Sequence, residues 1–338
     1  MLKFISFATT LIISGQVFSQ GCCSGGSGSP IAGGSSQGVL NERQFEISSS
    51  FQYSSANKFM VEDHDTLRMF NELRSSYQYT RFAYGVTKKL TFSIEGGYYY
   101  NRLQIGLENA DTIRSKGVGD LIIFPRYEII NKKTEKRNTE VTLGLGIKIP
   151  LGSYNDSTLV YVNPITKQEY YTISPPTVQA TNGSQDLIFY GFVMQEYIKP
   201  KIKVFANTIY IKKGWNPLSM KFGDYASVGL FVNRMFYKKR IGLTLQVKGE
   251  FVGEMKSDKN IDVLALYNID ERSTGSKKVF FVPQLSYSYK NFTLFALTEL
   301  PVYQYLNGTQ VASQFQATAG LAYRFLLSKE QKCDVIEK

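Results

Sequence analysis

The side chains that could carry acid–base chemistry are few in this sequence, and their spacing does not match catalytic sites. The single histidine, His64, lies between Asp63 and Asp65 in a polar stretch. A Ser–His nucleophilic site would have to use this histidine, and its acidic neighbours are typical of a solvated loop. No metal-ligand cluster, phosphate-binding glycine loop or dinucleotide fingerprint appears in a suitable context. We therefore predict a protein that is not an enzyme and that uses no metal and no cofactor.

Charged side chains do recur, but at alternate positions of amphipathic segments. Between residues 241 and 251, the apolar Leu243 and Leu245 alternate with Thr244, Gln246 and Lys248. In a β-strand, successive side chains point to opposite faces, so such a strand has one apolar and one polar face. Applied along the chain, this alternation places the following charges on the polar face: Glu46, Arg74, Glu95, Arg126, Glu128, Lys148, Lys248, Glu250, Glu299 and Arg324.

The elements that carry these charges form a repeated pattern. The alternation recurs about 12 times, in segments of about 9–12 residues, which is long enough for a tilted strand to cross a bilayer. Tyrosine and phenylalanine contribute 23 residues each and glycine 28, a composition that favours β-structure. No stretch beyond residue 20 is apolar enough for a membrane-spanning helix. We predict an all-β fold, an antiparallel transmembrane β-barrel of about 12 strands over residues 43–327.

The lengths of the connections alternate as well. Short connections are expected at 87–89, 131–138, 198–201, 237–240 and 289–291, and longer ones at 54–71, 106–119, 152–185, 213–223 and 253–277. A soluble sandwich would have shorter strands and no reason to alternate its connections. Short periplasmic turns and long extracellular loops are typical of barrels in the outer membrane of Gram-negative bacteria. Outer-membrane lipid is then a partner. Phe325, near the end of the last strand, suits insertion by the barrel-assembly machinery.

Both ends of the chain differ from the barrel in composition. Residues 1–19 have a basic start and an apolar core, which predicts a signal peptide cleaved after Ser19. Residues 20–42 are rich in glycine and serine and form either a flexible tail or a plug in the barrel mouth. Within them Cys22 is a candidate for lipid acylation, or else one of two adjacent thiols. Residues 328–338 form a charged tail.

The formal net charge of +11 does not indicate nucleic-acid binding. Lysines and arginines concentrate in the short connections, as in residues 132–137, whereas the long loops carry acidic runs such as residues 62–65. Binding to nucleic acid would require a basic stripe interleaved with aromatic residues. The basic turns would instead meet lipid phosphate at the periplasmic leaflet, or simply keep the turns soluble.

Three stretches together resemble a known family. Residues 115–121 (SKGVGDL) resemble a GxGD segment that enters a strand, residues 143–152 (LGLGIKIPLG) a GxGxKxPxG strand, and residues 175–186 (PPTVQATNGSQD) a PPxxQ…GSxD segment. Their order is similar to the outer-membrane transporter family named after the MetA pathway of phenol degradation, which is grouped with FadL-like barrels. One departure is 180–182, where a second glycine is expected. The residues that match are Gly117, Gly119, Asp120, Gly144, Gly146, Pro150, Gly152, Gly183, Ser184 and Asp186.

The resemblance implies an outer-membrane channel for passive uptake or efflux of a small solute, apolar or aromatic. The residues alone leave two outcomes open. Charges inside a barrel must be paired or hydrated. They either line a narrow wet channel or pair across the interior and close it. The closed alternative is a structural barrel whose extracellular loops bind a partner or a surface. Gly144 and Gly146 would face the interior and leave room there or permit a bend.

Overall fold

The computed structural model describes residues 38–107, 112–199, 201–237, 240–263 and 270–327. Within these residues, no helix is long and apolar enough to span a membrane. The predicted signal peptide, Cys22 and the charged tail lie outside the described residues.

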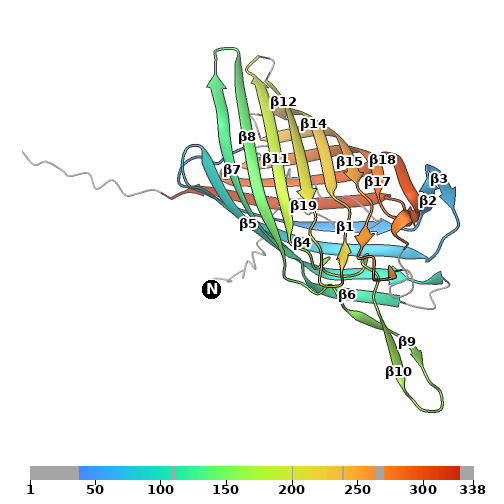
Figure 1. The fold of residues 1–338 in the computed structure, drawn as a ribbon. Coiled ribbons are helices and arrows are strands. Elements are labelled where there is room, and N and C mark those ends of the chain that lie inside the picture. The colour runs from blue at the N-terminus through green and yellow to red at the C-terminus, as the bar shows by residue number, and fades with distance from the viewer. Residues whose placement is uncertain (1–37, 108–111, 200, 238–239, 264–269, 328–338) are drawn as a thin grey trace, which may run out of the picture.

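The predicted barrel and its approximate strand number are confirmed. One antiparallel sheet contains fifteen strands, of which twelve close on themselves through the pairing of β17 with β18 (Figure 1). The wall strands are β1 (Gln44–Ala56), β4 (Glu72–Gly85), β5 (Leu90–Ile105), β7 (Asp120–Lys133), β8 (Arg137–Pro150), β11 (Asp186–Tyr197), β12 (Ile202–Lys212), β14 (Tyr225–Phe236), β15 (Ile241–Val252), β17 (Ser276–Tyr289), β18 (Phe292–Val311) and β19 (Phe315–Leu326).

The long connections carry further short elements at one end of the barrel. They are β2 (Phe59–Glu62), β3 (His64–Thr66), β6 (Thr112–Val118), β9 (Ser157–Val162), β10 (Glu169–Ile173), β13 (Met220–Lys221), β16 (Lys256–Ser257) and the 3-10 helix η2 (Glu271–Ser273). The β9–β10 hairpin projects beyond the wall, at the lower right of Figure 1. The short turns lie at the opposite end, the upper left of Figure 1. We call the end with the long connections the outer end.

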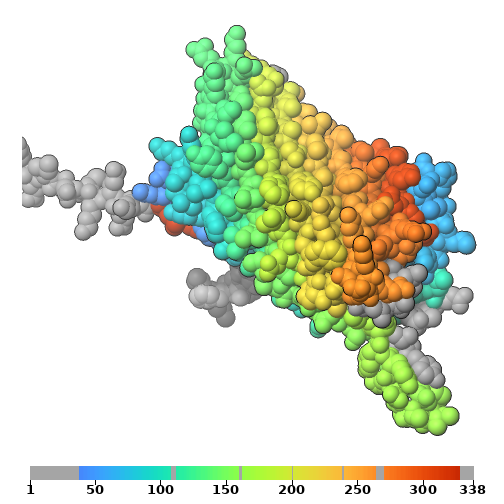
Figure 2. Space-filling model, in the orientation of Figure 1, coloured from blue at the N-terminus to red at the C-terminus, as the bar shows by residue number. Residues whose placement is uncertain are grey.

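Strand β15 shows how alternation produces the wall. Gln246 and Lys248 are buried in the interior, whereas Leu245 and Val247 are exposed on the outside. Large apolar side chains cover the outside of the other wall strands in the same way. Water would not solvate such a surface favourably, and hydrocarbon does. Figure 2 shows this outer surface, over the yellow and orange strands.

Strands β11, β12 and β14 depart from simple alternation because apolar side chains also dominate their inner faces, where Asn207, Ser227 and Asn233 are the polar exceptions on β12 and β14. Ile188 and Phe192 on β11, Phe205 and Ile209 on β12, and Phe231 on β14 are buried inside the barrel. Their outward neighbours, such as Leu187 and Leu230, are also apolar. Apolar side chains therefore lie on both faces of this part of the wall.

The chain enters the barrel from the end with the short turns. Gly38 and Leu40 are buried, and the Leu40 N–H donates to Thr91 Oγ1 on β5 at 2.7 Å. A Cβ built on Gly38 would lie 1.5 Å from Glu140 Oε1 on β8. Gly38 therefore allows the backbone to pass close to that carboxylate. The rest of the Gly/Ser-rich segment, through residue 37, lies outside the described residues, so its role as tail or plug stays a prediction.

Candidate functional site in the barrel lumen

One half of the lumen is lined by charges that pair with one another. Glu46 on β1 contacts Arg324 on β19 and lies 3.4 Å from Arg81 on β4. Arg81 lies 3.7 Å from Glu95 on β5, and the Tyr79 hydroxyl donates to the same glutamate. Because these residues come from neighbouring strands at matching registers, they form a continuous belt across four strands. The belt satisfies buried charges that would otherwise be costly.

A second charged group lies on β15 and β18. Lys248 Nζ is 2.7 Å from Glu299 and 3.7 Å from Glu250, and its ammonium lies 4.6 Å from the centre of the Phe280 ring. The Tyr225 hydroxyl donates to Glu250 at 3.2 Å. The lumen therefore contains both signs of charge. In the first group the charges pair across neighbouring strands, whereas Lys248 on β15 reaches past β17 to Glu299 on β18.

The structure places most of the ten predicted charges inside the barrel. Those buried are Glu46, Glu95, Arg126, Glu128, Lys148, Lys248, Glu250 and Glu299, and Arg324 is partly buried against Glu46.

Arg74 was predicted on the inner face, and this prediction is wrong. On β4 the inner positions are Tyr77, Tyr79 and Arg81, while Arg74 pairs with Glu72 at 2.6 Å on the other face. The error has a physical cause. Tyrosine rings fill a barrel interior well when the hydroxyl finds a partner, so an aromatic face is not necessarily the lipid face.

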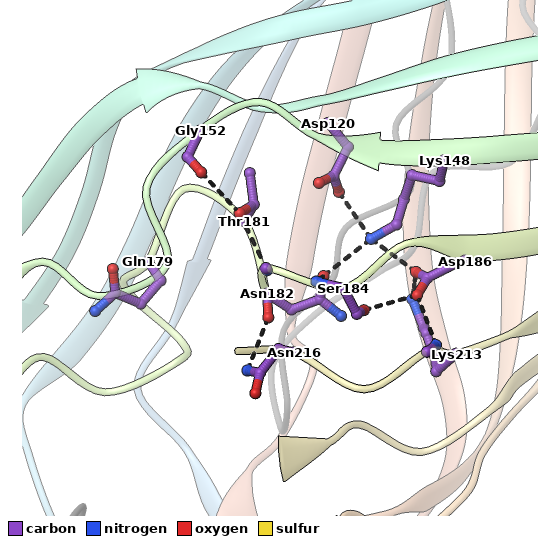
Figure 3. Close-up of polar contacts among 12 residues, drawn as sticks. Asp120, Lys148, Gly152, Gln179, Thr181, Asn182, Ser184, Asp186, Lys213 and Asn216 are labelled. Atoms are coloured by element: carbon purple, nitrogen blue, oxygen red, sulfur yellow. Dashed lines mark hydrogen bonds and ion pairs between the residues drawn. The ribbon is translucent and has the colours of Figure 1, made fainter. Parts of the chain in front are cut away.

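At the outer end, Lys148 is the centre of a polar cluster (Figure 3). Its Nζ lies 2.7 Å from Asp186 and 3.1 Å from Asp120, and it donates to Asn182 Oδ1 at 3.0 Å. Lys213 lies 3.1 Å from the same oxygen of Asp186. We call these two lysines and two aspartates, with Asn182, the mouth cluster. Its formal charges cancel.

Strand positions explain why the mouth cluster assembles. Asp120 and Asp186 are the first residues of β7 and β11, and Lys148 lies near the end of β8 between them. The register pairs Asp186 directly with Lys148. Lys213 follows the last residue of β12. Four neighbouring strands therefore each contribute one charge at the same height of the barrel.

Burial dominates the titration of Lys213. Removal from water lowers its pKa to about 8, although the negative charge of Asp186 acts in the opposite direction. The positive charge of Lys148 adds to the lowering. Lys213 is thus charged below pH 8 and neutral above it, and only the charged form balances the two aspartates.

The segment 174–185, which we call the inward segment, closes over the mouth cluster from the outer end. Val178, Ala180 and Ser184 are buried almost completely. Ser184 Oγ donates to Asp186 at 2.7 Å, and Thr181 Oγ1 donates to the Gly152 carbonyl at 3.0 Å.

Further hydrogen bonds fix the other half of the inward segment. Gln179 Nε2 donates to the carbonyls of Asp156 and Ser174 at 2.9 and 3.0 Å. Arg102 on β5 donates to the Gln179 carbonyl, and Asn216 Nδ2 donates to the Asn182 carbonyl at 3.0 Å. A long connection, and not a described part of the N-terminal segment, therefore occupies the outer mouth.

The part of the lumen around β11, β12 and β14 is mostly apolar. Phe205 stacks on Phe231 with ring centres 4.6 Å apart, and Phe124 meets Tyr190 edge to face at 5.6 Å. Gly144 and Gly146 of β8 lie under Phe124, where a Cβ would come within 2.9 and 2.7 Å of its ring. Glycine at these positions therefore makes room for an inward-pointing aromatic ring.

Residues of the three family-like stretches meet at the outer mouth. A Cβ on Gly117 would lie 3.8 Å from the Cβ of Ala180 in the inward segment, and a Cβ on Gly119 would lie 3.0 Å from the Tyr77 hydroxyl. Pro150 ends β8 beside Asp120. Gly183 has a φ of +76°, and a Cβ there would lie 2.6 Å from the Tyr154 ring. Gly152, Ser184 and Asp186 take part in the contacts described above.

Sequence reasoning missed Arg81, Arg102, Lys213 and the inward segment as parts of the lumen. Arg81 follows Thr80 in a segment assigned to the wrong face, and Arg102 and Lys213 lie at or beyond predicted strand ends. A signal was nevertheless present. The stretch that resembles PPxxQ…GSxD falls inside the longest loop. A loop that is only exposed to solvent has no need of a defined sequence pattern, so the pattern indicated a structured segment.

Among the described residues, no group of three or more His, Cys, Asp or Glu is placed to hold a metal ion. His64 is exposed in β3, where its Nδ1 lies 2.6 Å from Asp63.

The comparisons with known proteins concern the fold. The COG4313 outer membrane channel of Pseudomonas putida F1 superposes with a TM-score of 0.64 at 12% identity, covering 87% of this chain and all of that one. A FadL homologue of Pseudomonas aeruginosa gives a TM-score of 0.42 at 6% identity, covering 86% of this chain and 91% of the other. The P. putida toluene transporter TodX gives 0.37 at 10% identity, with 91% and 96% covered.

The first likeness establishes the fold, a closed barrel of the outer-membrane type, and the other two are too loose to add to it. The barrel fold that the family resemblance implied is thus confirmed. The three proteins are named as a channel, a FadL homologue and a transporter, not as enzymes. No protein-family model matches the chain, and no curated protein matches it in sequence.

Proposed function

We propose that this protein is an outer-membrane channel that lets a small apolar or aromatic solute pass without energy input. The observation that carries the proposal is the apolar inner wall of β11, β12 and β14. A barrel that served only hydrated solutes would not gather so many apolar side chains there. Buried aromatic rings instead offer an apolar solute a surface that water does not compete for.

The outer surface of the barrel and the lengths of its connections support a location in the outer membrane. Apolar side chains cover the outside of the barrel, the short basic turns lie at one end, and the long connections at the other. The protein with the established likeness in fold is itself described as an outer membrane channel. In this proposal the lumen residues Arg126, Lys148 and Glu299 position the walls and the mouth, and the apolar wall contacts the solute.

A second candidate is a closed structural barrel whose extracellular loops bind a partner or a surface. Two observations favour it. The lumen charges are paired, as between Lys248 and Glu299, so they do not line a wet pore. The β9–β10 hairpin also exposes apolar side chains, such as Ile165 and Tyr171, beyond the wall.

The uptake of a radiolabelled monoaromatic hydrocarbon by intact Gram-negative cells separates the two candidates. The test requires an intact outer membrane, because its outer leaflet resists apolar solutes that would cross a simple bilayer unaided. Cells that contain the protein should take up the label faster than cells that contain an unrelated closed barrel. Phe205→Asn, on the apolar inner wall, should slow uptake about tenfold, which corresponds to about 1.4 kcal/mol of lost apolar contact.

The matched control is Phe189→Leu, on the outward face of β11, which should leave uptake unchanged. The folded amount of each variant is measured by heat-modifiable electrophoresis of outer membranes. Uptake no faster than with the closed barrel would overturn the transport proposal and leave the structural candidate.

A further inference from the structure

A groove of about 550 Å³ lies on the outside of the wall, at the outer ends of β12, β14, β15 and β17. Three of its lining residues, Tyr210, Phe251 and Lys277, form its floor, and they lie in one row across neighbouring strands. Tyr210 pairs with Ala226, Ala226 with Phe251, and Phe251 with Lys277. Ala226, which lies between Tyr210 and Phe251 in this row, carries only a methyl group.

The groove faces away from the lumen. The chain neighbours of its floor residues, Ile211, Glu250 and Lys278, are buried inside the barrel, so Tyr210, Phe251 and Lys277 point outward by alternation. Phe251 and Tyr210 are indeed exposed. The yellow-to-orange part of the surface in Figure 2 belongs to this wall.

Basic side chains line the outer side of the groove. Lys221 and Lys256 come from the two-stranded sheet β13–β16 above the wall, and Lys277 comes from β17. Two acids also line the groove, but each has partners within the protein. Asp224 accepts from the Tyr210 hydroxyl at 2.9 Å and lies 3.6 Å from Lys221. Glu254 accepts from Asn307 Nδ2 at 3.0 Å.

Lys256 and Lys277 are therefore the cations that remain for an external ligand. Within the part of the chain that the structure describes, neither takes part in an ion pair, and both are exposed. The Lys277 ammonium lies 6.0 Å from the centre of the Tyr305 ring, which leaves it at the surface.

The groove opens towards an apolar surface. In the next row of outward positions, Val228 pairs with Gly249. A Cβ on Gly249 would lie 3.9 Å from the nearest atom, so the surface is open there as well. Leu230 and Val247 continue the apolar surface farther along the wall. A ligand that spans both zones would carry negative charge at one end and hydrocarbon at the other.

We propose that this groove binds a phosphorylated glycolipid of the outer leaflet, with its phosphate on Lys256 and Lys277 and an acyl chain over Ala226 and Gly249. The position of the groove selects this ligand. It lies at the outer ends of the strands, where the lipid headgroups of that leaflet lie, and two unpaired lysines match a phosphate in charge. The proposal rests on the membrane location and is independent of transport.

Trp215 provides a direct readout, because it is the only tryptophan and its backbone pairs with Lys221 at the groove. The refolded full chain in zwitterionic micelles is titrated with diphosphorylated lipid A, with the same glycolipid after removal of both phosphates, and with inorganic phosphate. We expect a saturable change in Trp215 fluorescence with the phosphorylated glycolipid alone.

Two variants test the two halves of the groove. The double variant K256Q/K277Q should weaken binding about tenfold or more, because it removes both cations. Ala226→Phe places a ring in the path that we propose for the acyl chain, and it should weaken binding without changing any charge. The control K116Q/K167Q removes two lysines from other outer loops and should bind as the wild type does.

Three results would overturn the proposal. The dephosphorylated glycolipid could bind equally well, inorganic phosphate alone could saturate the change at millimolar concentration, or the control could lose as much affinity as K256Q/K277Q. Each variant is first shown to be folded by heat-modifiable electrophoresis. An unchanged rate of hydrocarbon uptake by K256Q/K277Q separates loss of lipid binding from loss of the channel.

Discussion

Lys148 shows how a single residue can hold the outer mouth together. Its side chain has no contact with solvent, and its ammonium contacts two aspartates and one asparagine on three different segments. A buried cation is tolerated only when its partners surround it. Lys148 therefore links β7, β11 and the inward segment at one point.

Lys148→Met is expected to lower the free energy of unfolding by about 3–5 kcal/mol, because it leaves Asp120 and Asp186 buried with less compensation. Urea unfolding in lipid vesicles, followed by Trp215 fluorescence, measures the change. The matched control is Lys203→Met, which breaks a partly exposed pair with Glu196 at 3.5 Å. That loss should stay below about 1 kcal/mol. Equal losses in the two variants would contradict the central role of Lys148.

Lys213 gives the mouth cluster a dependence on pH. Its folded pKa of about 8 lies below its unfolded value near 10.5. The folded state then binds fewer protons than the unfolded state between these values, so stability rises with pH across this window. The free-energy cost of burying the Lys213 charge is fully present below pH 8 and is relieved by pH 10.5.

We therefore expect the wild type to gain up to about 3 kcal/mol relative to Lys213→Met between pH 8 and pH 10.5. When the unfolding free energy of Lys213→Met is subtracted from that of the wild type, the contributions of titrating groups that both proteins share cancel. Asp186, Lys148 and Asp120 face Lys213 and are present in both. Urea unfolding at several pH values gives the difference directly. A difference that stays constant over this range would contradict the lowered pKa.

At the scale of elements, the inward segment determines whether the outer mouth is open. Its conformation depends on Gly183, whose φ of +76° places the backbone against the Tyr154 ring. A side chain at this position would be strained and would also meet that ring. The hydrogen bonds of Thr181 and Ser184 would then be broken or displaced.

Gly183→Ala should open the outer mouth and raise the single-channel conductance in planar bilayers several-fold. The matched control is Gly191→Ala on β11. Its Cβ would lie 3.2 Å from the methyl carbon of Thr208, and the backbone of Gly191 does not have a positive φ. That variant should conduct as the wild type does. If Gly183→Ala leaves the conductance unchanged, the inward segment is not the constriction.

The sequence predicts some elements of this barrel far better than others. Residues 141–151 and 241–251 alternate cleanly because one face meets hydrocarbon and the other a polar lumen, and β8 and β15 follow them closely. Strand β4 was assigned to the wrong face because its inner face carries tyrosines, which placed Arg74 inside. Residue types alone do not distinguish a ring that fills a lumen from one that faces lipid.

The candidate site was harder to predict than the wall. Alternation located Lys148 and Glu299 on the polar face, but not the partners that neutralise them, since pairing depends on register between strands that are distant in sequence. The inward segment was expected to be part of a long loop, and its length gave no indication that it folds back into the barrel. Only the contacts of Gln179 and Asn182 reveal this inward fold.

At the scale of the whole molecule, the two ends of the barrel differ in length of connection and in charge. The β9–β10 hairpin projects from one end, and the β7–β8 turn projects from the other (Figure 1). In an outer membrane, long loops face the outside and short turns face the periplasm. This arrangement fixes which residues a reagent outside the cell can reach.

We predict that Ile165→Cys, at the tip of the β9–β10 hairpin, reacts with a membrane-impermeant maleimide in intact cells, because Ile165 is 89% exposed there. Glu135→Cys, in the β7–β8 turn, should react only after the cells are lysed. The wild-type chain, with Cys22, Cys23 and Cys333, is the background control. Labelling of Glu135→Cys in intact cells, with protection of Ile165→Cys, would reverse the orientation. It would also place the inward segment and the mouth cluster at the periplasmic end, and the lipid groove in the inner leaflet.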